Sequence, residues 1–161
     1  MTQVGALVCA GISGGKIVLW HYLPTKWNAK ETVELYEGPI KSALVKHRGV
    51  KRTYSLCEDN DPVGYKSKKG VAAKGALGIR TVQTPRYSPD LTPLDFSLWE
   101  EVERRALQCP RRKNESVASH KARWRQATLR LPETVVRKAV ADMKRRARTI
   151  VDAKAGNIPR D

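Results

Sequence analysis

The chain has 161 residues, of which 31 are Lys or Arg and 16 are Asp or Glu, so its formal net charge is +15. This length suits one domain with a buried core, and no segment approaches the roughly 20 apolar residues of a membrane span. The positive charge favours an acidic polymer as partner, with nucleic acid as the first candidate. Cys9, Cys57 and Cys109 lie far apart and lack metal-ligand spacing to a histidine, which indicates reduced, intracellular packing residues.

Residues 3–23 predict a β-hairpin. An apolar run from Val4 to Ile12 precedes the tight-turn tripeptide Ser13-Gly14-Gly15, and the segment Lys16–Leu23 after it is rich in β-branched and aromatic residues. No positive charge precedes the apolar run, which argues against a secretion signal. We therefore interpret this segment as scaffold.

A helix and then a strand are expected next. Asn28 can cap the helix, Gly38-Pro39 must kink or split it, and Gly49 ends it. Its apolar face comprises Val33, Tyr36, Ile40, Ala43 and Leu44. The strand Thr53–Cys57 then delivers the tripeptide Glu58-Asp59-Asn60 at its carboxyl end, where open α/β sheets place their chemistry. Acids at such a position are also common as solvated turn formers.

A basic helix over about Ser67–Leu77 and a short strand over Ile79–Gln83 follow the loop Asp61–Tyr65. Four lysines lie on or beside this helix, namely Lys66, Lys68, Lys69 and Lys74. We interpret the first three as candidate DNA contacts, because Lys side chains bind phosphate oxygens.

Three prolines within residues 85–93 stiffen the loop that leads into the next helix. Thr92 is its expected N-cap and Pro93 its first helical residue, which places Asp95 in the first turn. The same helical stripe continues through Trp99, Val102 and Ala106. An acid therefore leads the face that should be buried. It serves either in a capping box with Thr92 or as a functional carboxylate beside Asp59.

Two more helices are expected towards the end of the chain. After the basic linker Cys109–Lys113, Asn114 can cap a helix in which His120 is packed rather than a ligand. Pro132 opens the last helix, which closes at Gly156 and Pro159, and its apolar stripe comprises Val136, Val140, Met143, Ala147, Ile150 and Val151. Beside the stripe lie Lys138, Arg145, Arg146 and Arg148, which form either a solvated face or a phosphate-contacting surface.

This order of elements resembles the later part of a ribonuclease H-like domain. The segment Glu58-Asp59-Asn60-Asp61-Pro62 and the segment Tyr87–Trp99, with its Ser-Pro-Asp-Leu-Thr-Pro core, are similar to those of mariner-type DDE transposases that carry the second and third catalytic acids. Asp59 and Asp95 are 36 positions apart, which fits the spacing in that family. The resemblance covers most of the chain, and the second motif is highly specific.

The resemblance implies an α/β fold, with a mixed ribonuclease H-like sheet flanked by helices at about 1–108 and a helical extension at about 114–155. It implies metal-dependent DNA strand cleavage and transfer, in which Asp59 bridges two Mg²⁺ or Mn²⁺ ions and Asp95 binds one. The two acids should then approach each other at one end of the sheet. DNA is the expected partner and a second copy of the chain a further candidate, with no membrane and no small-molecule cofactor. The expected location is the nucleus in a eukaryote and otherwise the cytoplasm with the nucleoid.

Two departures from the family lead to an alternative. The first acid of the family lies on a strand before the hairpin and has no counterpart here, and Gly64 stands where the family usually has His. We therefore expect a partial domain that lacks the first, central strand and is inactive alone. The alternative function is a catalytically inactive remnant that acts only as a basic DNA-binding or oligomerising module.

Overall fold

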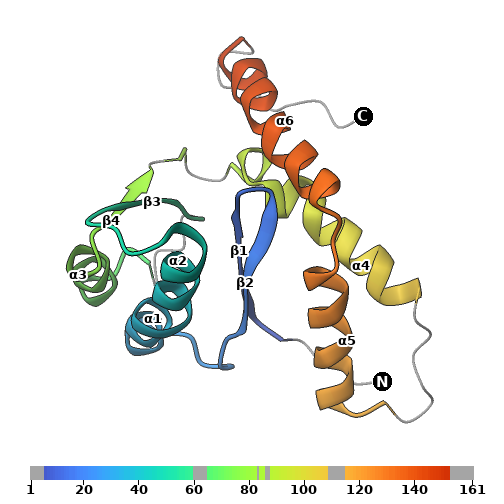
Figure 1. Ribbon diagram of the computed structural model, residues 1–161, viewed down its shortest axis with the longest axis horizontal. Coiled ribbons are helices and arrows are strands. Elements are labelled where there is room, and N and C mark those ends of the chain that lie inside the picture. The colour runs from blue at the N-terminus through green and yellow to red at the C-terminus, as the bar shows by residue number, and fades with distance from the viewer. Residues whose placement is uncertain (1–5, 60–64, 83, 86–87, 109–114, 153–161) are drawn as a thin grey trace. The chain divides into compact units, whose positions relative to one another are not determined.

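The computed structural model describes residues 6–59, 65–82, 84–85, 88–108 and 115–152 (Figure 1). Contacts divide the chain into two compact units. The first comprises residues 1–11 and 18–87, and the second comprises residues 12–17 and 88–161. No helix in the described part of the chain is long and apolar enough to cross a membrane.

A hairpin of β1 (Val8–Ser13) and β2 (Lys16–Tyr22) confirms the first prediction from the sequence. The connecting residues Gly14 and Gly15 have φ angles of 59° and 80°. Two successive positive φ angles are those of a type I′ turn, which suits the twist of antiparallel strands and which glycine adopts without strain. The Ser-Gly-Gly tripeptide therefore sets the register of the hairpin.

A parallel ladder joins β3 (Tyr54–Cys57) to β4 (Ile79–Val82), in register from the pair Tyr54 and Ile79 to the pair Cys57 and Val82. The helix α3 (Lys68–Ala76) forms the crossover, and the Ser67 hydroxyl caps it by accepting from the Gly70 amide at 3.1 Å. Antiparallel and parallel pairing thus occur together, which confirms the predicted mixed α/β architecture. Among the described residues the two ladders are not hydrogen-bonded to each other.

The helix predicted after Asn28 is split, as its Gly-Pro pair requires. It consists of α1 (Ala29–Leu35), a π-helical turn η1 (Tyr36–Ile40) and α2 (Lys41–Arg48). Pro39 lies inside the π-helical turn, where the wider winding accommodates its missing amide hydrogen. These helices and α3 cover one side of the β3–β4 ladder (Figure 1). The resulting core comprises Leu35, Tyr36, Ile40, Ala73 and Ile79.

The second unit is helical and confirms the predicted C-terminal helices. It contains a 3₁₀ turn η2 (Pro89–Leu91), a π-helical turn η3 (Leu94–Leu98), α4 (Trp99–Gln108), α5 (Val117–Leu129) and α6 (Glu133–Asp152). Leu98, Val136 and Ala139 form its buried cluster. The Pro132 carbonyl accepts from the Val135 amide at 3.0 Å, so Pro132 opens α6 as predicted.

Some predictions about this second unit are changed or fall outside the described residues. Ser116, which accepts from the Ser119 amide at 3.1 Å, is the cap of α5 in the structure. The predicted cap Asn114, the linker 109–113 and the closing residues Gly156 and Pro159 lie outside the described ranges. His120 is packed as predicted, since its ring lies 6.0 Å from that of Trp124 and its Nδ1 3.5 Å from Glu115 Oε2.

Candidate functional site

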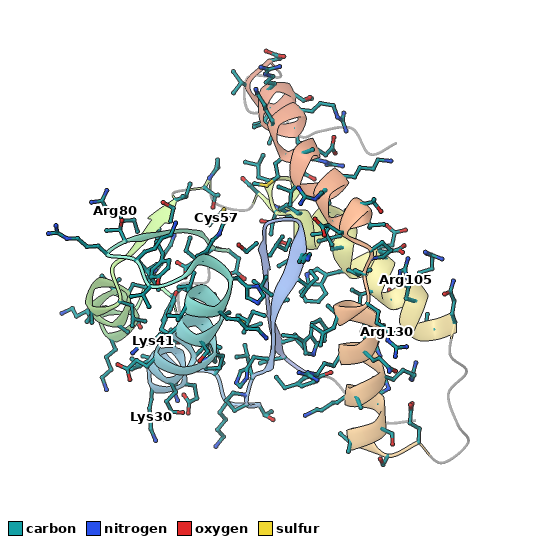
Figure 2. The ribbon with its side chains drawn as sticks, in the orientation of Figure 1. Lys30, Lys41, Cys57, Arg80, Arg105 and Arg130 are labelled. Carbon is teal, nitrogen blue, oxygen red and sulfur yellow. The ribbon has the colours of Figure 1, made fainter. Side chains whose placement is uncertain are left out.

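Asp59 follows β3 directly and is exposed. Side chains alternate across the strand, so that Tyr54, Leu56 and Glu58 are partly covered whereas Ser55, Cys57 and Asp59 are exposed. Glu58 is therefore partly covered where Asp59 is exposed, and, in addition to burial, the charges of both carboxylates raise the pKa of the same thiol, that of Cys9. Cys57, labelled in Figure 2 on β3, is exposed, so its assignment as a packing residue is wrong. The period-two pattern of β3 places it on the outer face.

Glu58 lies in a buried polar cluster with three donors, which we call the Glu58 cluster: Glu58, Tyr36, Lys74 and Thr81. Its Oε2 accepts from Lys74 Nζ at 2.8 Å and from Thr81 Oγ1 at 3.2 Å. Its Oε1 accepts from the Tyr36 hydroxyl. Burial and the neighbouring Glu58 carboxylate raise the pKa of Tyr36 well above its ordinary value, so this hydroxyl stays a donor.

Lys74 lies on the predicted basic helix, as expected, but its side chain is buried, unlike those of the other three lysines. Its side chain is only 9% exposed, because α3 turns this position inward together with Gly70 and Ala73. Positions 70, 73 and 74 have the spacing of one helical face. This spacing is the sequence signal that could have identified Lys74 as buried. By contrast, Lys66, Lys68 and Lys69 are exposed at the start of α3, with no carboxylate partner among the described ion pairs.

Asp95 lies in η3, close to the beginning of the helical segment. Its amide donates to the Thr92 carbonyl at 2.9 Å, but Pro93 stands at the cap position of η3 and no side chain caps the segment, so the predicted cap by the Thr92 side chain is wrong. Its carboxylate accepts from Trp99 Nε1 at 3.2 Å, one turn further along. Burial raises the pKa of Asp95, and the Trp99 hydrogen bond partly opposes that rise. Because the Asp95 carboxylate is hydrogen-bonded to Trp99, the structure favours a functional, oriented carboxylate over the alternative of a capping box with Thr92.

Asp59 belongs to the first unit and Asp95 to the second, so their proximity stays a prediction. Both are exposed carboxylates, and carboxylate oxygens are the donors that Mg²⁺ and Mn²⁺ accept. The donor type therefore fits such an ion. The number of possible metal ligands is small, because the described residues contain no group of three His, Cys, Asp or Glu side chains that could hold a metal. Asn60, Asp61 and Gly64 lie outside the described residues.

Comparison with solved structures defines the class of fold. The chain superposes on the catalytic domain of Mos1 mariner transposase, solved with Mn, with a TM-score of 0.81 and 17% identity over 96% of this chain and 78% of that chain. The Mos1 paired-end complex with the left transposon end gives a TM-score of 0.82 at 16% identity, over 99% of this chain and 47% of that chain. The fold is thus the ribonuclease H-like fold of the Mos1 catalytic domain.

A sequence relative carries the identification further. The Tcb1 transposase of Caenorhabditis briggsae is 34% identical over 107 residues, which cover 64% of this chain and 36% of the relative. The matched part is thus about a third of that relative, and no family model matches the chain. The chain is thus similar in sequence to part of one transposase, and it has the fold of the Mos1 catalytic domain.

Proposed function

We propose that this chain is part of a DDE-type transposase catalytic domain that binds DNA and supplies Asp59 and Asp95 as metal ligands for strand cleavage and transfer. The observation that carries the proposal is the pair of exposed carboxylates in a chain with this fold, one directly after β3 and one at the start of η3. Asp59 and Asp95 lie in the two segments, 58–62 and 87–99, that resemble the motifs of mariner-type transposases. The transposase relative and the fold favour this function over an inactive remnant.

The metal would be held by Asp59 and Asp95, and Mg²⁺ or Mn²⁺ suits their oxygens; Mos1 catalytic domains were solved with either ion. When bound, the metal would activate water or a DNA hydroxyl and stabilise the leaving oxygen. The chain itself orients the ligands. Trp99 Nε1 holds Oδ1 of Asp95 and restricts rotation of the carboxylate, while the β3–β4 ladder supports the backbone before Asp59.

Metal binding can be tested directly by titrating the 161-residue chain with Mn²⁺ and following free Mn²⁺ by electron paramagnetic resonance. Asp59→Asn and Asp95→Asn should each weaken binding at least tenfold, because each removes a charged ligand. Asp152→Asn is the matched control, an exposed acid at the end of α6 that should bind like the wild type. Absence of Mn²⁺ binding by the wild type, or an equal loss in the control, would overturn the proposed metal site.

DNA binding is proposed to use Lys66, Lys68 and Lys69, which lie together and exposed at the start of α3. Lysines of this kind bind phosphates, so the affinity should be independent of sequence and should fall with salt. Replacing all three by Ala should reduce the slope of log affinity against log salt by about 2.7, or about 0.9 for each phosphate that is no longer neutralised.

The control for this triple variant removes the same charge elsewhere. Lys26, Lys41 and Lys46 are also exposed, and Lys41 is labelled on α2 in Figure 2. Their replacement by Ala should change the salt slope less than the first triple. Equal slopes for the two triples, or strong preference for one DNA sequence over a scrambled duplex, would contradict the assignment.

A further inference from the structure

The Glu58 cluster joins three separate elements of the first unit to one carboxylate. Tyr36 comes from η1, Lys74 from α3 and Thr81 from β4, so the donors span most of that unit. Lys74 Nζ also donates to Thr81 Oγ1 at 3.0 Å and lies 5.7 Å from the centroid of the Tyr36 ring. The four side chains therefore hold one another as well as the carboxylate.

Stability alone does not account for such a cluster. The Glu58 and Lys74 side chains are only 8% and 9% exposed, so both charges are desolvated. Apolar residues of the same size often replace a buried ion pair with no loss of stability. What a saturated polar cluster supplies instead is a defined position for each of its members.

The position that Glu58 fixes is the end of β3. Beyond Cys57 the ladder with β4 has no further paired residue among those described. Glu58 is the next residue, and its carboxylate is held by hydrogen bonds within the covered cluster, while the adjacent Asp59 is exposed. The Glu58 cluster thus holds the backbone in place directly after the last residue of β3 that pairs with β4.

We infer that Glu58 is a positioning residue, which with Tyr36, Lys74 and Thr81 fixes the backbone that presents Asp59 to a divalent metal. This inference rests on the proposed function. Glu58 itself is not a metal ligand, since both of its oxygens are engaged within the cluster.

The test compares an apolar replica of the cluster with the wild-type chain. The replica carries Tyr36→Phe, Glu58→Leu, Lys74→Met and Thr81→Val, which removes every donor and acceptor together and leaves none unpaired. It should keep its melting temperature within a few degrees, because no buried polar group is orphaned. It should bind Mn²⁺ about tenfold more weakly, the low end of the losses caused when support of a metal ligand is removed.

Two further variants separate positioning from folding. Glu58→Asp keeps the charge but is one methylene too short to reach all its donors, and it should weaken Mn²⁺ binding several-fold even if the replica does not fold. Glu115→Gln is the control, because it breaks the buried pair with Arg123 in the second unit. It should lower the melting temperature and leave Mn²⁺ affinity within twofold.

A metal-independent measurement distinguishes this inference from the proposed function. Amide hydrogen exchange across residues 54–59 should quicken about tenfold in the replica, and more modestly in Glu58→Asp. If the wild type binds no Mn²⁺, the proposed metal site fails and this exchange alone decides the role of Glu58. Unchanged exchange and Mn²⁺ affinity in both variants, or a loss of affinity that merely follows melting temperature and also occurs in Glu115→Gln, would overturn the inference.

Discussion

Leu98→Ala should show how firmly the helix that carries Asp95 is anchored. Leu98 is 0% exposed and packs with Val136 and Ala139 in the buried cluster of the second unit. Alanine removes three carbon atoms, which corresponds to roughly 2.4 kcal/mol at about 0.8 kcal/mol each. The residual cavity raises the expected loss to about 3 kcal/mol. Since domains are stable by only about 5–15 kcal/mol, the effect should be large.

Urea denaturation followed by circular dichroism measures this loss of unfolding free energy. The melting temperature should fall by roughly 6–12 °C. Leu107→Ala is the matched control, because it makes the same change in α4, which directly follows η3, at a side chain that is 65% exposed. It should alter stability by no more than about 0.5 kcal/mol. A cost below about 1 kcal/mol for Leu98→Ala, or similar costs for both variants, would refute the assignment of Leu98 to the core.

Three other predictions follow from local features. Ser67→Ala should cost about 1 kcal/mol in urea denaturation by removing the cap of α3, and an unchanged midpoint would contradict it. Burial raises the pKa of the Cys9 thiol to about 11, so iodoacetamide at neutral pH should label the exposed Cys57 before Cys9 in peptide mapping; faster labelling of Cys9 would refute this. Because Asp59 and Asp95 supply only two carboxylates, the purified chain should not nick supercoiled DNA with Mg²⁺ or Mn²⁺. Nicking that Asp59→Ala abolishes would show otherwise.

The features predicted correctly are those encoded by neighbouring residues. Gly14 and Gly15 mark the hairpin turn, Gly38-Pro39 marks the split in the first helix, and Pro132 marks the start of α6. Each depends on backbone preferences or on a repeat that one short segment contains. Local patterns therefore determine most of the element order.

The features that were missed depend on partners distant in the sequence. The burial of Lys74 was not predicted, because its partner Glu58 lies 16 positions away and meets it only after α3 packs on the ladder. Cys57 looked like a packing residue because no local pattern tells which face of a short strand is covered. The meeting of Asp59 and Asp95 is likewise non-local, and it stays a prediction.

The π-helical turn η3 sets the angle at which the backbone of Asp95 is presented relative to the α-helix that follows. A π-helical turn takes up about one residue more than an α-helical turn, and one residue corresponds to a rotation of roughly 100° in an α-helix. Deleting a single residue between Leu94 and Leu98 would thus permit a regular helix while α4 keeps its buried stripe, yet would swing the acid about a quarter of a turn. The length of this one helical turn therefore acts together with the Trp99 hydrogen bond to set where the carboxylate points.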